Sequence, residues 1–422
     1  MLSKDFILVV IGQIISLFGN AILRFALPLY LLNQTNSPAL FGIVSACSFI
    51  PMIVLSPIGG IVADRINKRS IMVVLDLFTA ILSIGVVLLL GKVNLIVLML
   101  IALIILYGIQ GAYQPAVQAS IPALVSTKNL MPANAVINLV SSIARLVGPV
   151  IGGILYVTLG IYTILYLGFF CFLFSAIIEI FIKIPFKKRE TKDNAIEIVL
   201  NDMKESYQFI KEEKPVVGKA ALLLAAINLF FSTLIIIGLP VIVTQKLGLE
   251  PVYANKLYGF AEGALAAGGL AGGILAGIMG RNLQIKNADK LLIFCSLTIL
   301  PIGIVLLIKI PSIMAYGVIV ASCFIMMVLS SIFSIELMSY VQMITPNDLI
   351  GKVMSLAMCI CLSAQPIGQA VYGMLFELVP NRIGILFILS TVICLVISVY
   401  SKKVFCNMPV CHTQLQEILE VN

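Results

Sequence analysis

Long apolar stretches, separated by short polar turns, occupy nearly the whole chain of 422 residues. Twelve of them are long enough to cross a bilayer as helices, since a crossing needs about 20 apolar residues. The predicted spans cover residues 6–33, 39–63, 70–91, 94–119, 132–158, 161–184, 217–245, 254–280, 289–309, 312–342, 350–379 and 381–404. Because a backbone inside lipid must satisfy its own hydrogen bonds, this pattern predicts an all-α membrane protein with 12 transmembrane helices.

One polar stretch is much longer than the turns between the other spans, and it contains Lys187-Lys188-Arg189-Glu190. It divides the chain into an N-terminal six-helix bundle, a cytoplasmic linker, a C-terminal six-helix bundle and a cytoplasmic tail. The predicted boundaries are 1–184, 185–216, 217–405 and 406–422. Within the linker, residues 195–213 predict a short amphipathic surface helix, with Ile196, Leu200, Met203 and Tyr207 on its apolar face.

The second half of the chain repeats the first at a nearly constant offset. Leu40-Phe41-Gly42 recurs 217 positions later as Leu257-Tyr258-Gly259, and Pro149 recurs at the same offset as Pro366. Such a repeat predicts two pseudo-symmetric bundles in parallel arrangement.

Composition agrees with this architecture, since 61% of the residues are hydrophobic and only 11% are charged. The formal net charge is +8, but the positions of the charges argue against a nucleic-acid partner. With both termini in the cytoplasm, 20 of the 27 Lys and Arg residues fall on the cytoplasmic side and five on the other. This bias follows the positive-inside rule and predicts a multi-pass protein of the cell membrane.

A charged side chain inside a span is costly unless it is paired or faces water, and five of those in the predicted spans are candidates for a function: Arg24, Asp76, Arg145, Glu262 and Glu336. A carboxyl group in apolar surroundings can bind and release protons near neutral pH, so Glu262, Glu336 and Asp76 are candidates for proton coupling. The alternatives are a structural ion for the two glutamates, an ion pair with the nearby basic loop for Asp76, and a clamp on backbone carbonyls for Arg145.

The loop between spans 2 and 3 carries the most specific motif, Gly60-Ile-Val-Ala-Asp64-Arg65-Ile-Asn67-Lys68-Arg69. It resembles the signature of the major facilitator superfamily, G-x-L-A-D-R-x-G-R-K, with Asn67 in place of the last glycine. Asparagine tolerates the left-handed backbone that glycine adopts. The resemblance implies the major facilitator fold and a gating role for this loop, carried by Gly60, Asp64, Arg65, Lys68 and Arg69. The alternative is a basic loop that only fixes orientation.

Further stretches resemble the drug-exporting branch that includes the bacterial macrolide efflux proteins and the enterobactin exporters. They are residues 114–125, residues 129–135, and Gly351-Lys352-Val353-Met354 with Gln365-Pro366-Ile367-Gly368. In span 5, Gly148, Pro149, Gly152 and Gly153 resemble the antiporter motif of drug exporters, where small residues allow close packing and proline allows a bend. The arginine that many proton-coupled exporters carry in span 4 is absent, and Gln110, Tyr113 and Gln114 occupy that region.

In this superfamily spans 1, 4, 7 and 10 line a central path. Polar residues at helical spacing are therefore expected to face this path. The resemblance implies that the substrate contacts Gln13, Asn20, Arg24, Gln110, Gln114, Arg145, Phe230 and Tyr340. A lining of this kind suits a bulky amphipathic solute.

The function we expect is secondary active export of amphipathic, macrolide-like compounds by proton antiport with alternating access. The alternatives are a lysophospholipid flippase, with Arg24 on the lipid phosphate, and a siderophore exporter. The sequence contains no Walker motif or HExxH motif, so we expect neither an ATP-driven pump nor an enzyme, and no cofactor or metal. The expected partners are the lipid bilayer, the solute and protons, and we expect the protein to act as a monomer.

Overall fold

The computed structural model describes residues 3–185, 195–279, 288–308, 310–346 and 349–406. The first half contains α1 (Lys4–Thr35), α2 (Pro38–Arg65), α3 (Lys68–Leu89), α4 (Leu95–Leu124) and α5 (Leu130–Ile180), followed by the linker helix α6 (Ala195–Gln208). In the second half, α7 (Pro215–Ile227), η3 (Asn228–Ser232), α8 (Thr233–Val241) and η4 (Ile242–Lys246) form one span. The remaining helices are α9 (Pro251–Met279), α10 (Ala288–Leu297), α11 (Leu300–Val305), α12 (Ser312–Ile344), α13 (Ile350–Leu378) and α14 (Ile383–Cys406).

Helix α5 supplies two crossings of the membrane. Its 51 residues include Gly160, whose φ of 75° and ψ of 177° break the helix. On either side of this break, Gly148 packs on Ala21 and Gly168 packs on Leu23, so both segments run along the same part of α1. Eleven helices of the described chain are long and apolar enough to span a membrane, and α5 counts twice. The prediction of an all-α fold with 12 crossings is therefore confirmed.

The short polar turns between spans also start the next helix. Ser37 caps α2 by accepting a hydrogen bond from the Leu40 amide at 3.2 Å, and Asn94 accepts one from the Ile96 amide at 3.0 Å to cap α4. Asn67 caps α3 in the same way through the Arg69 amide at 3.0 Å. The φ of Asn67 is −59°, so the left-handed backbone suggested by its place in the motif is wrong, and its structural role is helix capping.

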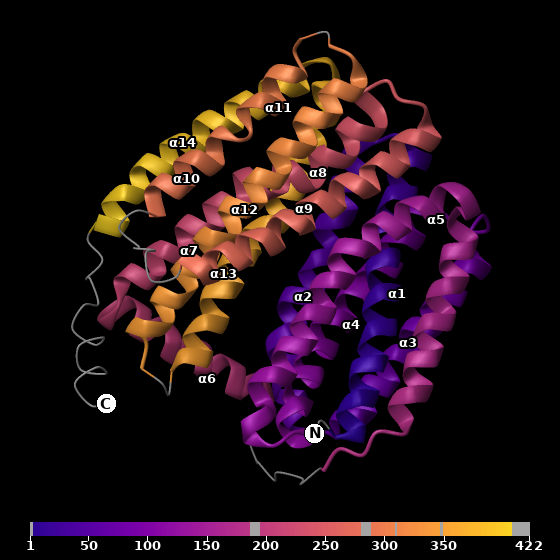
Figure 1. The fold of residues 1–422 in the computed structure, drawn as a ribbon, viewed down its shortest axis with the longest axis vertical. Helices are drawn as coiled ribbons and strands as arrows, with labels where there is room; N and C mark the ends of the chain where they lie inside the picture. Colours follow the sequence, from indigo (N-terminus) through magenta and orange to yellow (C-terminus); the bar gives the residue numbers. More distant parts are fainter. Residues whose placement is uncertain (1–2, 186–194, 280–287, 309, 347–348, 407–422) are drawn as a thin grey trace.

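The two halves form two bundles that meet at the upper end of the molecule in Figure 1, opposite the N-terminus. Gly42 of α2 lies against Gly373 of α13, and Gly153 of α5 lies against Gly259 of α9. Gly42 and Gly259 are the repeat-related pair, so the two contacts are pseudo-symmetric. At the same end Asn33 Nδ2 donates to Asn255 Oδ1 at 2.9 Å. Toward the lower end the ribbons of the two bundles diverge (Figure 1).

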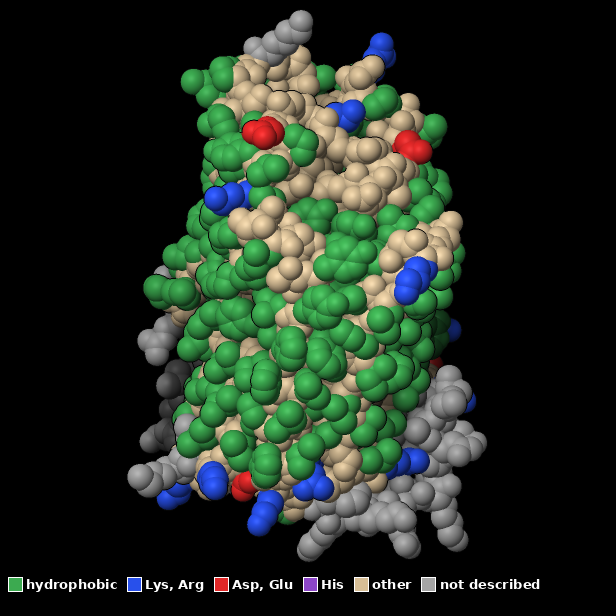
Figure 2. All heavy atoms as spheres, turned by 90° about the vertical axis from the view of Figure 1, so that its right-hand side faces the viewer, with side chains coloured by type: hydrophobic (Ala, Val, Ile, Leu, Met, Phe, Trp, Pro, Cys, Tyr) green, Lys and Arg blue, Asp and Glu red, His purple; other side chains and the backbone are tan. Residues whose placement is uncertain are grey.

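The outer surface has the polarity expected of a bilayer-embedded protein. Figure 2 shows apolar side chains over the middle of one face, with Lys and Arg side chains gathered along the lower edge and fewer charges at the upper end. Large apolar side chains such as Ile81, Phe174 and Val396 are more than half exposed, which in a membrane protein is contact with lipid.

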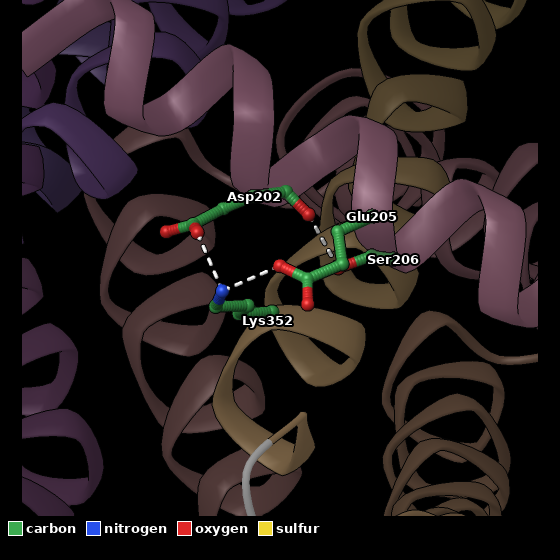
Figure 3. A network of polar contacts seen from close by, with 4 residues as sticks. All are labelled: Asp202, Glu205, Ser206 and Lys352. Carbon is green, nitrogen blue, oxygen red and sulfur yellow. Dashed lines mark hydrogen bonds and ion pairs between the residues drawn. The ribbon is translucent and has the colours of Figure 1, made fainter.

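The linker helix α6 crosses the lower end and attaches to α13 through Lys352 (Figure 3). The Lys352 ammonium lies 2.9 Å from Asp202 Oδ1 and 2.6 Å from Glu205 Oε2. Met203 and Tyr207, two residues of the predicted apolar face, are exposed, whereas Ser206 and the following Phe209 and Ile210 are buried. The side chains of Ile196 and Leu200, linker residues 186–194 and tail residues 407–422 lie outside the described structure.

We expect the substitution Lys352→Ala to lower the free energy of unfolding by less than about 1 kcal/mol, because exposed ion pairs contribute little. The Lys352 side chain is 34% exposed, so water screens both of its contacts. The measurement is thermal unfolding of the purified protein in detergent at low and high salt. A loss several times larger would mean that the linker helix holds the lower ends of the bundles in place.

Candidate functional site

A cavity of about 1180 Å³ lies between the two bundles and is lined by both. Its N-terminal wall includes Asn20, Arg24, Gln110, Gln114, Gln118 and Arg145, and its C-terminal wall includes Phe231, Ser232, Tyr258, Glu262, Met327 and Gln369. Five of the predicted substrate contacts, Asn20, Arg24, Gln110, Gln114 and Arg145, therefore share one cavity. It fits a drug-sized solute.

Two contacts hold the side chain of Arg24 in the cavity. Its Nη1 donates to Gln110 Oε1 at 2.6 Å, and its guanidinium lies 3.9 Å from the centre of the Tyr107 ring. The cation–π contact and the amide fix the side chain, while leaving the guanidinium without a carboxylate partner in the described structure. Arg145 is exposed in the same cavity, and among the described residues it makes no hydrogen bond to the carbonyls near Pro149.

Glu262 of α9 supplies a negative charge to the same cavity. Its Oε1 accepts a hydrogen bond from the Tyr258 hydroxyl at 3.1 Å, one helical turn earlier. The Tyr258 ring stacks on Phe25 of α1, with ring centres 4.9 Å apart. The carboxylate is thus linked through one tyrosine to a helix of the opposite bundle.

The rest of the lining is apolar and adaptable. Six methionines line the cavity: Met52, Met326, Met327, Met338, Met354 and Met358. Methionine is flexible and polarisable, and it is over-represented at surfaces that bind varied ligands. A side pocket of about 230 Å³ shares several of these residues and extends into the C-terminal bundle among apolar side chains.

Five of the predicted substrate-contact and proton-coupling residues do not line this cavity. Gln13 is fully buried inside the N-terminal bundle, where its Nε2 donates to the Tyr113 hydroxyl at 2.7 Å. Phe230 does not line the cavity, whereas its neighbour Phe231, in the same π-helical turn η3, does. Tyr340 is 3% exposed and packs in the core of the C-terminal bundle. Glu336 is buried on the same face of α12 as Leu337 and Tyr340.

Asp76 is also outside the cavity and belongs to a buried polar cluster of the N-terminal bundle. Its Oδ1 accepts from the Ser16 hydroxyl at 3.0 Å, and it forms no ion pair with a basic loop residue in the described structure. The Tyr113 hydroxyl donates to Glu179 Oε1 at 2.7 Å. Glu179 was not among the predicted site residues, because it lies near the end of its predicted span, where a carboxylate usually faces water.

The gating motif lies at the lower end, between α2 and α3. Gly60 has open space where a Cβ atom would be, so its place is not explained by close packing. The Arg69 guanidinium reaches the carbonyl of Ile180 at 3.5 Å, which ties the loop to the end of α5. Lys68 begins α3 and Arg65 ends α2. The side chain of Asp64 lies outside the described residues.

The antiporter-like motif packs against both bundles. Gly148 and Gly152 lie on α1, against Ala21 and Phe25, whereas Gly153 faces Gly259 of the other bundle. Pro149 lines the cavity, and its carbonyl oxygen lies beside Gly259. The motif therefore joins a contact within one bundle to the contact between bundles.

Two six-helix bundles around a polar cavity define a polytopic membrane transporter. The chain belongs to the Major Facilitator Superfamily, whose sequence pattern it matches over residues 9–369. It is 27% identical to macrolide efflux protein A of Streptococcus pyogenes over 92% of this chain and 93% of that protein. It is 24% identical to macrolide efflux protein A of Enterococcus faecalis over 77% of this chain and 97% of that protein.

Solved structures show the same fold at low sequence identity. The nucleoside transporter NupG superimposes with a TM-score of 0.71 and 11% identity, covering 96% of this chain and all of that one. A bacterial homologue of ferroportin in an inward-facing state superimposes with a TM-score of 0.69 and 15% identity, covering 94% of this chain and 98% of that one.

Proposed function

We propose that this transporter exports bulky amphipathic compounds of the macrolide type across the cell membrane in exchange for protons. The observation that carries the proposal is the cavity itself, which combines six methionines with one carboxylate, Glu262. Flexible apolar walls accept solutes of varied shape, and a single acid selects those that carry a positive charge. Similarity to two macrolide efflux proteins over most of the chain supports the same substrate class.

Transport then proceeds by alternating access, with both termini in the cytoplasm. In that orientation the glycine contacts at the upper end close the extracellular side, and the cavity faces the cytoplasm, from which substrate is taken up. Binding shifts the balance toward the opposite state only if the solute or the proton interacts differently with the two states. In this cycle the gating loop acts at the cytoplasmic end of the bundles and the Gly153–Gly259 contact acts at the extracellular end.

The proton enters the cycle at Glu262. With the cavity open to the cytoplasm, the ionised carboxylate attracts a cationic solute. After the switch, a proton from outside neutralises the carboxyl group and releases the solute. Tyr258 can follow either state, since its hydroxyl donates to a carboxylate and accepts from a carboxylic acid.

A second candidate, export of an anionic amphipath such as a lysophospholipid or a siderophore, is favoured by the two arginines of the cavity. Arg24 has no carboxylate partner in the described structure, and Arg145 is exposed beside it in the lining. Either guanidinium can hold a phosphate or carboxylate group of a substrate.

The experiment is to record internal pH in proteoliposomes under an imposed proton gradient, while macrolides, cationic dyes, lysolipids and siderophores are added in turn. We expect proton flux that requires a cationic amphipath and falls about tenfold or more in Glu262→Gln. The exposed carboxylate variant Glu250→Gln is the control. Compound-dependent transport without proton flux, or flux unchanged in Glu262→Gln, would overturn the proposal.

A further inference from the structure

A second acidic site lies inside the N-terminal bundle, apart from the cavity. It brings together Gln13 of α1, Asp76 of α3, Tyr113 of α4 and Glu179 of α5, all of them at most 4% exposed. Hydrogen bonds of 2.7 Å run from Gln13 Nε2 to the Tyr113 hydroxyl and from this hydroxyl to Glu179 Oε1. Glu179 also interacts electrostatically with Asp76. All four helices of the site belong to one bundle.

The hydrogen-bond donors of this site are too few for its acceptors. Asp76 Oδ1 accepts from Ser16, and Glu179 Oε1 accepts from Tyr113. Three other buried oxygens, Gln13 Oε1, Asp76 Oδ2 and Glu179 Oε2, have no partner among the described residues. Tyr113 has already used its one proton, and the Ser175 hydroxyl has one proton for two acceptors, the Gly12 carbonyl at 3.1 Å and the Asp76 carboxyl group. Buried acceptors without donors are rare in folded proteins because each costs free energy.

The site also contains two acidic groups and no basic partner among the described residues. Neither Asp76 nor Glu179 forms an ion pair in the described structure. The Arg69 guanidinium, a basic group at this end, bonds to the backbone carbonyl of Ile180 at 3.5 Å. Asp5 accepts a hydrogen bond from the Lys183 amide at 2.9 Å, just beyond the end of α5, and forms no hydrogen bond with this site among the described residues. Two adjacent ionised carboxylates without a cation cannot both stay buried.

One bound proton would correct both the shortage of hydrogen-bond donors and the excess of negative charge. On one carboxyl group, it cancels one charge and turns an unpaired acceptor oxygen into a donor, which can bond to another unpaired oxygen of the site. We propose that Asp76 and Glu179 form a second proton-binding site, distinct from Glu262, whose protonation is linked to the transport cycle. This inference rests on the proposed proton antiport and adds a site to it.

The site is connected to the cavity through two helices. Tyr113 directly precedes the cavity residue Gln114 on α4, and Gln13 lies on α1, which carries Asn20 and Arg24 into the cavity. Glu179 lies over α1 at Gly12, where a Cβ atom would make ordinary van der Waals contact with Glu179 Cγ at 3.4 Å. Loss of the proton would make the carboxylates of Asp76 and Glu179 repel each other and so strain the packing of α3 and α5, which carry them, in the bundle they share with α1 and α4. Protonation and the shape of the cavity are thereby coupled.

The site lies close to the lower end, which gives protons a short path. Gln13 is roughly 14 Å along the helix axis from the first residue of α1. Glu179 is the penultimate residue of α5. With the termini in the cytoplasm, the pair would exchange protons with the cytoplasmic side, whereas Glu262 meets protons through the cavity.

The test combines infrared spectroscopy with transport, using the full-length protein. Difference spectra between the wild type and the double variant Asp76→Asn with Glu179→Gln should reveal the carbonyl stretch of a protonated carboxyl group at neutral pH. Both substitutions keep the shape of the side chain, and thermal unfolding checks that the variants fold. The exposed variant Glu250→Gln should leave the spectrum unchanged. Absence of the band in the wild-type spectrum, even before any variant is made, would overturn the inference.

In proteoliposomes, the double variant should release about one proton fewer per substrate transported and lose most of the pH dependence of substrate binding. Glu262→Gln should leave the infrared band in place. If the wild type shows proton-linked export and the double variant keeps the same proton count, the second site is wrong and the proposed function stands. If the wild type moves no protons but the band is present, the proposed function fails, and with it the link between this site and transport. Dependence of transport on Na⁺ instead of pH, lost in the double variant, would overturn the assignment to a proton.

Discussion

The substitution Gly259→Val is expected to reduce transport by about a hundredfold while each bundle remains folded. A Cβ atom at this position would lie 2.7 Å from the Pro149 carbonyl oxygen and 3.2 Å from Gly153 Cα. Both are backbone atoms on α5 of the opposite bundle, so neither can move aside alone. Overpacking of this kind costs about 1–3 kcal/mol, and here only the state in which the upper ends meet bears the cost. A penalty near 3 kcal/mol lowers the population of that state by about a hundredfold.

The measurement is the distance between spin labels placed at Val252 and Leu159, which are exposed near the upper ends of α9 and α5. We expect longer distances in Gly259→Val than in the wild-type protein, together with the loss of transport. Gly277→Val is the matched control, because it lies on the same helix and a Cβ atom there meets nothing within 4 Å. Normal transport by Gly259→Val would mean that the cycle does not need the contact between Gly153 and Gly259.

Much of the fold could be predicted because hydropathy and turn chemistry are local properties. A run of about 20 apolar residues has few alternatives to a membrane helix, and Ser or Asn at a turn caps the helix that follows. One exception is instructive. Spans 5 and 6 are helical right up to Gly160, so they form one continuous element, α5, and only a glycine at positive φ turns the chain back.

The candidate site was predicted less well. Helical spacing indicates which residues share a face of a helix, but not whether each of them reaches the cavity or is buried inside the bundle. Gln13 lies on the same stripe of α1 as Asn20, yet it faces the bundle interior while Asn20 faces the cavity. Phe230 was expected from the family resemblance, which does not settle which of two adjacent residues faces the cavity. Both lie in the π-helical turn Asn228–Ser232, and Phe231 lines the cavity.

Glu179 shows a third kind of failure, which concerns distant partners. The residue that accounts for its burial is Tyr113, 66 positions away, and no local pattern links the two. The missing arginine in span 4 was a usable signal, since Tyr113 and its neighbours stand where a cation was expected. A buried tyrosine needs a partner for its hydroxyl, and here that partner is a carboxyl group.

The charges of Arg24 and Glu262 are expected to act in opposite directions on the binding of a cationic amphipath. Both side chains line the same cavity, where the effective dielectric constant is well below that of water, so each acts on a bound charge over several ångströms. We expect Glu262→Gln to weaken binding about tenfold and Arg24→Gln to strengthen it about tenfold, a difference of about a hundredfold between the variants.

The measurement is the dissociation constant of three fluorescent amphipaths of similar size, one cationic, one neutral and one anionic, with the protein in detergent. The neutral compound is the control for changes in cavity shape, and its affinity should change less than about twofold in either variant. Gln110→Leu separates the charge of Arg24 from its positioning, because Gln110 Oε1 holds the guanidinium at 2.6 Å without contributing a net charge. An anionic compound that binds most tightly to the wild type and loses its affinity in Arg24→Gln would contradict the export of cationic drugs. That outcome would favour a lipid or siderophore substrate, because the arginines of the cavity would then be its selective groups.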